Sequence, residues 1–117
     1  MIRLSTPKGA ISVDSAVYTN LAGYAASNCF GVKGMVMRSM SDGLWHLLRK
    51  EAMGKGVRVT FHDDNSISID LHIMVDKGVN LSAIGSSIIS EVRYFVTKST
   101  GTEVRAVNIF VDSITID

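Results

Sequence analysis

The chain of 117 residues contains a single cysteine, a single proline and no long apolar run. One cysteine, Cys29, cannot form a disulfide within the chain, which is typical of a protein from a reducing compartment. No stretch approaches the roughly 20 apolar residues of a membrane-spanning helix, so direct membrane insertion is not expected. The first residues also lack the apolar core of a secretory signal. These absences predict a cytoplasmic protein that would reach a membrane only through a partner.

A large excess of charge is also missing. The chain has 12 lysines and arginines against 11 acidic residues, so its formal net charge is +1. The basic residues of the central third are Lys33, Arg38, Arg49, Lys50, Lys55 and Arg58. Because Asp42 and Glu51 interrupt this group, a solvated surface is the preferred interpretation, and nucleic acid is not an expected partner. A small nucleic-acid-binding α+β module is the alternative function.

The sequence does contain enough apolar material for one core. Hydrophobic residues make up 46% of the chain and charged residues 20%. This composition predicts a folded protein, and the length fits one domain covering residues 1–117.

The most informative pattern lies between Lys55 and Val75. Apolar residues alternate on both sides of a turn-forming cluster, Asp63-Asp64-Asn65, which predicts a β-hairpin with one buried and one wet face. The alternating residues are Val57, Val59, Phe61, Ile67, Ile69, Leu71, Ile73 and Val75.

The register of this hairpin follows if its apolar residues share one face. Phe61 then lies opposite Ile67, and His62 faces Ser66 across a three-residue loop in which Asn65 can adopt a left-handed conformation. On the wet face the same register places Arg58 opposite Asp70, and opposite charges at such a position favour it.

Before the hairpin, the pattern predicts a short strand over residues 9–13 and then a helix from about Val13 to Phe30. Ser12 is its expected N-cap, and Gly31 is expected just after its end. Its expected apolar stripe is formed by Val17, Leu21 and Tyr24. A second short strand is expected over residues 35–37.

After the hairpin, a second helix is expected to begin at Asn80 or Ser82 and to end at Thr100-Gly101. Its expected apolar stripe comprises Leu81, Ile84, Ile88, Val92, Phe95 and Val96. A last strand over residues 103–111 would then run parallel to the second strand of the hairpin. The predicted fold is an α+β two-layer sandwich, in which two main helices pack on one face of a small mixed sheet.

The segment from Ser39 to Met53 leaves two interpretations open. Ser41 and Asp42 could cap a short helix that contains Trp45, or the whole segment could be a mobile loop.

The residue types that carry catalysis or bind metals leave one weak candidate, the cluster of His62, Asp63 and Asp64, for which a solvated turn is the preferred interpretation and a small enzyme the alternative. The three histidines are His46, His62 and His72, and the hairpin register places the last two roughly 20 Å apart, too far to share one metal ion. Cys29 follows a helix made of small residues and is expected to be structural. No Gly-x-Ser-x-Gly elbow is present, and the glycines at 31 and 34 lack the spacing of a phosphate-binding loop. No cofactor is expected.

Two surfaces are candidates for binding a partner. One is the segment around Met35, Met37, Met40, Trp45 and Met53, because methionine suits adaptable contacts as well as irregular cores. The other is the wet face of the hairpin, with Arg58, His62, Asp70 and His72. For the methionines, core filling and partner contact are left as equal alternatives.

The order of several short motifs resembles the alkaline shock protein family of Gram-positive bacteria, also called the envelope stress response family, and in particular its short, stand-alone members. The motifs are Gly-Ala-Ile-Ser-Val at 9–13, Leu-Ala-Gly-Tyr-Ala-Ala at 21–26, Gly-Val-Lys-Gly-Met at 31–35, Lys-Gly-Val-Arg-Val at 55–59, Ile-Asp-Leu-His-Ile-Met-Val at 69–75, Gly-Val-Asn-Leu at 78–81 and Val-Asn-Ile-Phe-Val at 107–111. They extend over nearly the whole chain. Cys29-Phe30 stands where the family often has an acid and a proline, and residues 39–53 match only loosely.

This resemblance implies a non-enzymatic protein of cell-envelope homeostasis. It implies a homo-oligomer, and a partner that is a membrane-anchored protein or a kinase-like protein of fatty-acid metabolism. The family has no catalytic residues that could be transferred to this chain.

Overall fold

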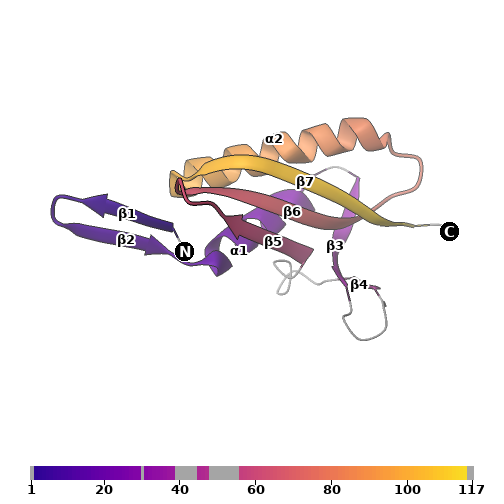
Figure 1. The fold of residues 1–117 in the computed structure, drawn as a ribbon. Helices are drawn as coiled ribbons and strands as arrows, with labels where there is room; N and C mark the ends of the chain where they lie inside the picture. Colours follow the sequence, from indigo (N-terminus) through magenta and orange to yellow (C-terminus); the bar gives the residue numbers. More distant parts are fainter. Residues whose placement is uncertain (1, 30, 39–44, 48–55, 116–117) are drawn as a thin grey trace.

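The computed structural model describes residues 2–29, 31–38, 45–47 and 56–115, with the backbone alone for residues 33–38 and 45–47. The helices and strands follow the order β1 (Ile2–Thr6), β2 (Gly9–Val13), α1 (Ser15–Ser27), β3 (Val32–Arg38), β4 (Trp45–Leu47), β5 (Val57–Phe61), β6 (Ser66–Val75), α2 (Leu81–Thr100) and β7 (Glu103–Ile114). Figure 1 shows β3 to β7 as one sheet and β1 with β2 as a separate hairpin.

The central hairpin has the predicted register. Phe61 pairs with Ile67 and Arg58 with Asp70 in the antiparallel ladder of β5 and β6. The His62 N–H donates to the Ser66 carbonyl at 2.9 Å, and Asn65 has φ 68°, the left-handed conformation expected of a turn asparagine. Alternation of apolar residues around a turn cluster was therefore sufficient to fix this register.

β6 lies at the centre of the five-stranded sheet. β5 pairs with residues 67–71 of β6, β3 pairs with residues 73–75, and β7 runs parallel to β6 along its whole length. Because β7 occupies one edge of β6 over residues 66–75, β3 and β5 share the other edge. The parallel pairing of β6 and β7 confirms the prediction for the last strand.

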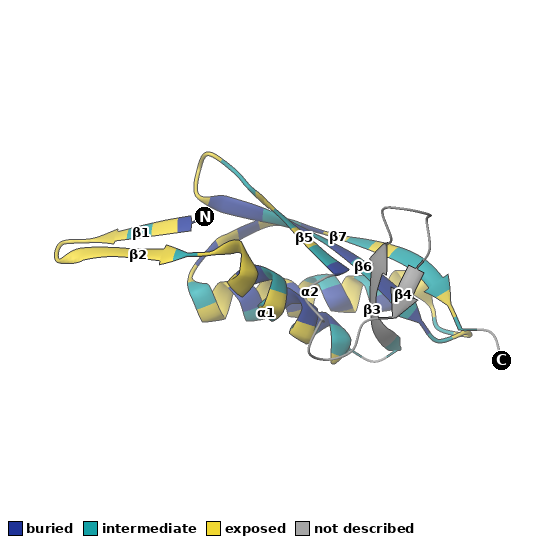
Figure 2. Ribbon diagram, turned by 90° about the horizontal axis from the view of Figure 1, so that it is seen from below, coloured by how far each residue is buried: buried dark blue, intermediate teal, exposed yellow. Residues whose placement is uncertain are grey.

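Both helices cover the same face of this sheet, as Figure 2 shows. Buried side chains of β6 alternate with partly exposed ones, and the buried set packs with α1 and α2 into one core. The most deeply buried large side chains are Tyr18, Ile2, Ile67, Ile69, Leu71, Ile73, Ile88, Val75, Val92 and Val96. This arrangement confirms the predicted two-layer α+β fold.

The first helix differs from its prediction in its bounds and its buried face. α1 begins at Ser15 rather than Val13 and ends at Ser27, with Asn28 as C-cap, so Ser12 is not the N-cap and Gly31 lies beyond the helix end. Val17 and Tyr24 are 42% and 51% exposed, whereas Tyr18, Ala22 and Ala26 are buried. The helix is apolar on more than one side, and the small residues at 22 and 26 allow the closer approach to the core.

The second helix agrees with its prediction. The Asn80 side chain caps α2 by accepting a hydrogen bond from the Ala83 N–H at 3.0 Å, and Gly101 ends it with φ 73°. Its buried stripe is Ile84, Ile88, Val92 and Val96. Leu81, which was expected in this stripe, is 45% exposed. No helix in the described part of the chain combines the length and apolar character needed to cross a bilayer.

The N-terminal hairpin of β1 and β2 projects from the body of the molecule (Figures 1 and 2). Only β2 was expected from the sequence. In the register of this hairpin Leu4 lies opposite Ile11, and the Asn65 side chain donates to the Arg3 carbonyl at 3.1 Å. The arm is thus attached to the turn between β5 and β6 near its base.

The segment from Ser39 to Met53 is described only at residues 45–47. These form β4, which pairs antiparallel with residues 36–38 of β3, so the helical interpretation is wrong for Trp45 to Leu47. Pairing with β3 supplies backbone hydrogen bonds to these residues, and tryptophan is a residue type enriched in strands. The rest of this segment lies outside the described residues.

Candidate interaction surface

The face of the sheet opposite the helices carries no covering element among the described residues (Figures 1 and 2). We name it the open sheet face. Its side chains come from β5, β6 and β7 and the start of the following turn, and they are partly or fully exposed. They are Arg58, Thr60, His62, Ser68, Asp70, His72, Asn108, Phe110 and Asp112. The predicted wet-face residues of the hairpin are therefore all on this surface.

The two described histidines of this face have separate partners. His62 Nε2 shares a hydrogen bond with Ser68 Oγ at 2.7 Å. His72 Nδ1 lies 2.7 Å from Asp112 Oδ2 on β7. The His72 ring also stacks on Phe110, with ring centres 4.8 Å apart and planes 13° apart. These contacts join β6 to the turn on one side and to β7 on the other.

Asp70 is held by β7 rather than by β5. The Asn108 side-chain amide donates to Asp70 Oδ1 at 2.9 Å. Arg58 lies opposite Asp70 in the ladder, as predicted, but no ion pair joins these two described residues. The opposite charges were a correct guide to register, although they do not form a direct contact.

Two irregularities of β7 aim charged side chains along this surface. The pairing with β6 skips Arg105 near the start of the strand and Asp112 near its end. A residue skipped in this way forms a β-bulge, which redirects its side chain. Arg105 reaches Asp64 in the hairpin turn, and Asp112 reaches His72.

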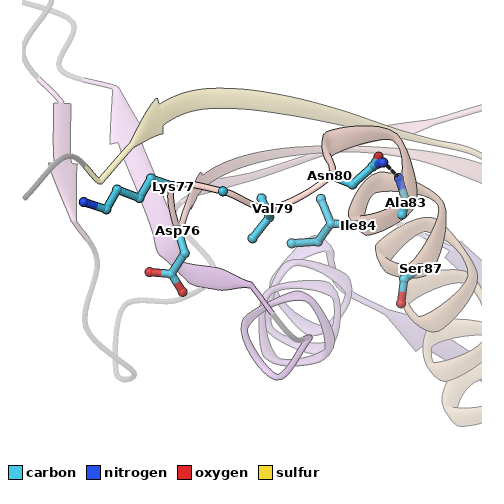
Figure 3. Close-up of a pocket in the computed structure, with 8 residues that line it drawn as sticks. Asp76, Lys77, Val79, Asn80, Ala83, Ile84 and Ser87 are labelled. Carbon is cyan, nitrogen blue, oxygen red and sulfur yellow. Dashed lines mark hydrogen bonds between the residues drawn. The ribbon is translucent and has the colours of Figure 1, made fainter.

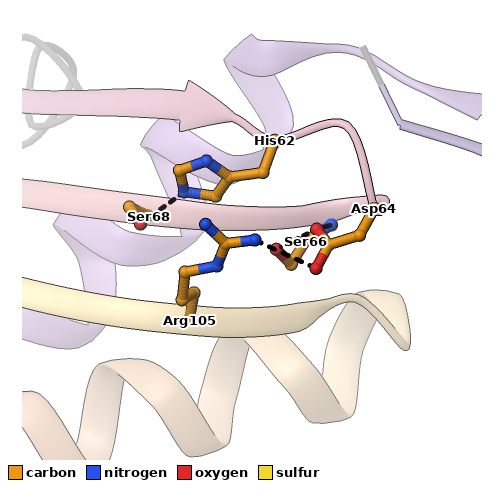
Figure 4. Close-up of polar contacts among 5 residues, drawn as sticks. All are labelled: His62, Asp64, Ser66, Ser68 and Arg105. Carbon is orange, nitrogen blue, oxygen red and sulfur yellow. Dashed lines mark hydrogen bonds and ion pairs between the residues drawn. The ribbon is translucent and has the colours of Figure 1, made fainter.

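The turn end of the open sheet face forms a polar cluster (Figure 4). Asp64 Oδ1 accepts hydrogen bonds from the Ser66 hydroxyl at 2.6 Å and from the Ser66 N–H at 3.2 Å, and Arg105 donates to Oδ2 at 3.0 Å. These bonds lower the pKa of Asp64 to about 2, and the bond from the Ser66 hydroxyl has the largest effect. The cluster connects β7 to the turn and positions Arg105 beside His62 and Ser68.

The remaining candidate groups carry little chemistry. Cys29 is half-buried and its thiol donates to the Ala25 carbonyl at 3.4 Å. Burial, reinforced by Glu91, raises the pKa of this thiol, which lowers the fraction present as the reactive thiolate. The described residues contain no group of three His, Cys, Asp or Glu side chains able to hold a metal ion.

A hollow of about 550 Å³ lies at the start of α2 (Figure 3). Its Asn80 side chain is used to cap the helix, and Val79, Ala83 and Ile84 contribute apolar surface. Figure 3 places Asp76 and Lys77 at the end of the hollow away from Ser87.

The methionine and tryptophan surface stays a prediction. Met35 and Met37 lie in β3 and Trp45 in β4, where the backbone alone is described, and His46 lies beside Trp45 in β4. Met40 and Met53 lie outside the described residues.

The sequence interpretation did not include Asn108, Phe110, Asp112 and Arg105 in the candidate surface. The predicted parallel pairing of the last strand could have placed Asn108 and Phe110 beside the hairpin, because they alternate with Val107 and Ile109. The two bulges leave no comparable signal in a single sequence.

Comparison with known proteins gives a consistent result. The profile of the alkaline shock protein 23 family, described as "cell envelope-related function", matches residues 3–116. The Bacillus subtilis (strain 168) protein YloU is 34% identical over 98% of this chain and 96% of its own length. Spy1614 of Streptococcus pyogenes serotype M6 is 31% identical over 98% of this chain and 95% of its own length. YqhY of B. subtilis is 30% identical over 96% of this chain and 82% of its own length. All three relatives are described as uncharacterized.

Proposed function

Because the chain belongs to the alkaline shock protein 23 family, whose function is related to the cell envelope, we propose that it is a non-enzymatic interaction module acting through self-association and partner binding. The match confirms the resemblance to the alkaline shock proteins that the sequence motifs indicated. The finer function rests on the following observations.

The main support is the open sheet face. Among the described residues no element covers this side of the sheet, and the side is long, because β6 has 10 residues and β7 has 12. Lateral hydrogen bonds hold the side chains of this face in fixed positions. They join His62 to Ser68, Asn108 to Asp70 and His72 to Asp112. A surface ordered before binding loses less side-chain entropy when a partner docks.

The composition of this face favours a protein partner. Charges of both signs, at Arg58, Asp70 and Asp112, surround the flat stack of His72 on Phe110. An aromatic centre with a mixed polar rim is typical of protein interfaces, whereas phosphate backbones select uniformly basic surfaces. We propose a membrane-anchored protein or a kinase-like protein of fatty-acid metabolism as the partner, and a cytoplasmic location.

The hydrogen bonds of the open sheet face also support a non-enzymatic role. His62 contacts a serine, but no described carboxylate orients this imidazole. A catalytic triad needs an acid on the imidazole that activates the nucleophile. Asp64, near His62, is bound to Ser66 and Arg105 instead.

The experiment is affinity capture from a lysate of cells that naturally contain this protein. The tagged chain should retain a defined partner, and Asp70→Lys combined with His72→Glu should lose it. The matched control, Glu91→Lys combined with Arg93→Glu, changes two exposed charges on α2 and should capture the partner as the unchanged chain does.

Equal capture by all three chains would overturn the assignment of the open sheet face. A chain that retains no partner in these lysates would count against partner binding altogether. Retardation of nucleic acid by the purified chain at roughly 50 mM salt, where phosphate contacts are strong, would favour the nucleic-acid alternative.

A further inference from the structure

β7 is an edge strand over most of its length. It pairs with β6 on one side, and no described strand pairs with its other side. An edge strand of 12 residues presents a long row of unpaired backbone N–H and C=O groups, which are ready to pair with a further strand.

This edge lacks the features that prevent such pairing. Residues 106–111, Ala-Val-Asn-Ile-Phe-Val, contain no charge and no proline, and both bulges lie outside them. By contrast, β5, which lies on the other side of β6 from β7, has only five residues and includes the charged Arg58. Short length and charge are the usual protection of strand edges, so β7 is the edge that is left open.

An apolar groove accompanies the edge of β7. It has a volume of about 540 Å³, with small or apolar residues of α2 on one side and residues 107–111 of β7 on the other. Leu81 at one end is 45% exposed, and Phe110 of β7, whose ring stacks on His72 on the open sheet face, is 44% exposed. Gly85 faces open space, since a Cβ added there would meet no atom within 4 Å.

We propose that β7 pairs antiparallel with β7 of a second copy of this chain, so that the two sheets become one. This inference rests on the proposed self-association and names the surface responsible. Antiparallel pairing by a two-fold axis keeps the helices of both copies on the same side of the joined sheet. The two α2 helices would then face each other across Gly85, and apolar side chains of each copy would fill the groove of the other.

The charges at the two ends of β7 favour a second copy in this orientation. Arg105 precedes the uncharged segment and Asp112 follows it. Antiparallel pairing brings Arg105 of each copy near Asp112 of the other, whereas parallel pairing would place like charges together. With the axis through residue 108, Asn108 of each copy would lie directly opposite Asn108 of the other, and Arg105 would lie opposite residue 111, next to Asp112.

A cysteine placed at this axis tests the geometry directly. In a Cys29→Ser background, Asn108→Cys should form a covalent dimer under mild oxidation, because paired strands hold facing Cα atoms within the range of a disulfide, about 4.4–6.8 Å. The matched control is Thr60→Cys, an exposed position on the short edge strand β5, which should stay monomeric on denaturing gels.

A second pair of variants tests the interface without a disulfide. Phe110→Lys places like charges across the axis and should weaken the dimer by at least roughly tenfold, measured by light scattering. Tyr94→Lys removes an aromatic side chain that is 60% exposed on α2, away from the groove, and should leave the dimer unchanged.

The outcomes separate this inference from the proposed function. An oligomer that is unaffected by Phe110→Lys and not cross-linked by Asn108→Cys would overturn the β7 interface while self-association remained. Cross-linking through Thr60→Cys would assign the contact to β5 instead. A strictly monomeric chain would overturn the β7 interface and self-association, whereas partner binding is tested separately by the capture experiment.

Discussion

The hydroxyl groups of Tyr18 and Thr102 lie 2.6 Å apart in the core, where they connect α1 to the residue before β7. Both side chains are buried, and 84 residues separate them in the sequence. This contact explains which side of α1 faces the core, since only Tyr18 among the apolar residues of that helix both fills the interior and satisfies the Thr102 hydroxyl.

Tyr18→Phe should lower the free energy of unfolding by about 1–3 kcal/mol, because the buried Thr102 hydroxyl loses its partner. Urea titration measures this change. Tyr24→Phe is the control. Because Tyr24 is half-exposed, loss of its hydroxyl group should change the free energy of unfolding by less than about 0.5 kcal/mol. The double variant Tyr18→Phe with Thr102→Val should recover part of the loss. Equal stabilities of Tyr18→Phe and the unchanged chain would refute this role.

Gly31 lies against α2 with φ 90°, and a Cβ there would overlap with Ile84 Cδ1. Gly31→Ala should therefore lower the free energy of unfolding by about 1–3 kcal/mol through both backbone strain and overpacking. Gly78→Ala is a matched control, because Gly78 has φ 86° but no atom within 4 Å of its Cβ position. Thermal unfolding should show the larger loss for Gly31→Ala, and the reverse order would contradict the packing described for these helices.

The Asp64 cluster predicts a specific dependence of stability on pH. The pKa of Asp64 is about 2 in the folded chain, and its ordinary value is 3.8. The ionised carboxylate therefore stabilises the fold at pH values above 3.8. Below it, the unfolded chain binds the proton first, and this stabilisation is lost as pH falls toward the folded pKa. As pH falls between these two values, the free energy of unfolding of the unchanged chain should decrease more steeply than that of Asp64→Asn. The control variant, Asp63→Asn, should follow the unchanged chain. Parallel pH profiles would show that the cluster does not form in solution.

The half-buried Cys29 thiol should react slowly. Because burial raises its pKa, less thiolate is present at mildly alkaline pH than in the unfolded chain. Reaction with a disulfide reagent at pH 8 should be slower in buffer than in denaturant, where the thiol is exposed. Equal rates under both conditions would indicate that this end of α1 is open to solvent.

The sequence was sufficient to predict a structural feature where the local residue pattern and the fold agree. The β5–β6 register was predictable because each strand has one apolar face and the turn residues leave only one arrangement of three loop residues. The caps of α2 were predictable for the same reason, since Asn80 and Gly101 supply the conformations that helix ends require.

Other features depend on contacts that no local pattern contains. Tyr18, on the buried side of α1, contacts Thr102, which lies far along the chain. β1 has a weak alternation, and its strand is stabilised by pairing with β2. The bulges at Arg105 and Asp112 arise from the match between two strands separated by α2, so the positions of these charges on the open sheet face could not be read from β7 alone.

Association of the chain through its sheet has a simple consequence for its mass in solution. The molar mass of the purified 117-residue chain is measured by light scattering as the concentration is raised. Association through β7 predicts a mass of at least twice the 12.7 kDa of one chain, falling toward one chain on dilution, and a lower mass for Phe110→Lys. A mass of 12.7 kDa at every concentration, unchanged by Phe110→Lys, would contradict it.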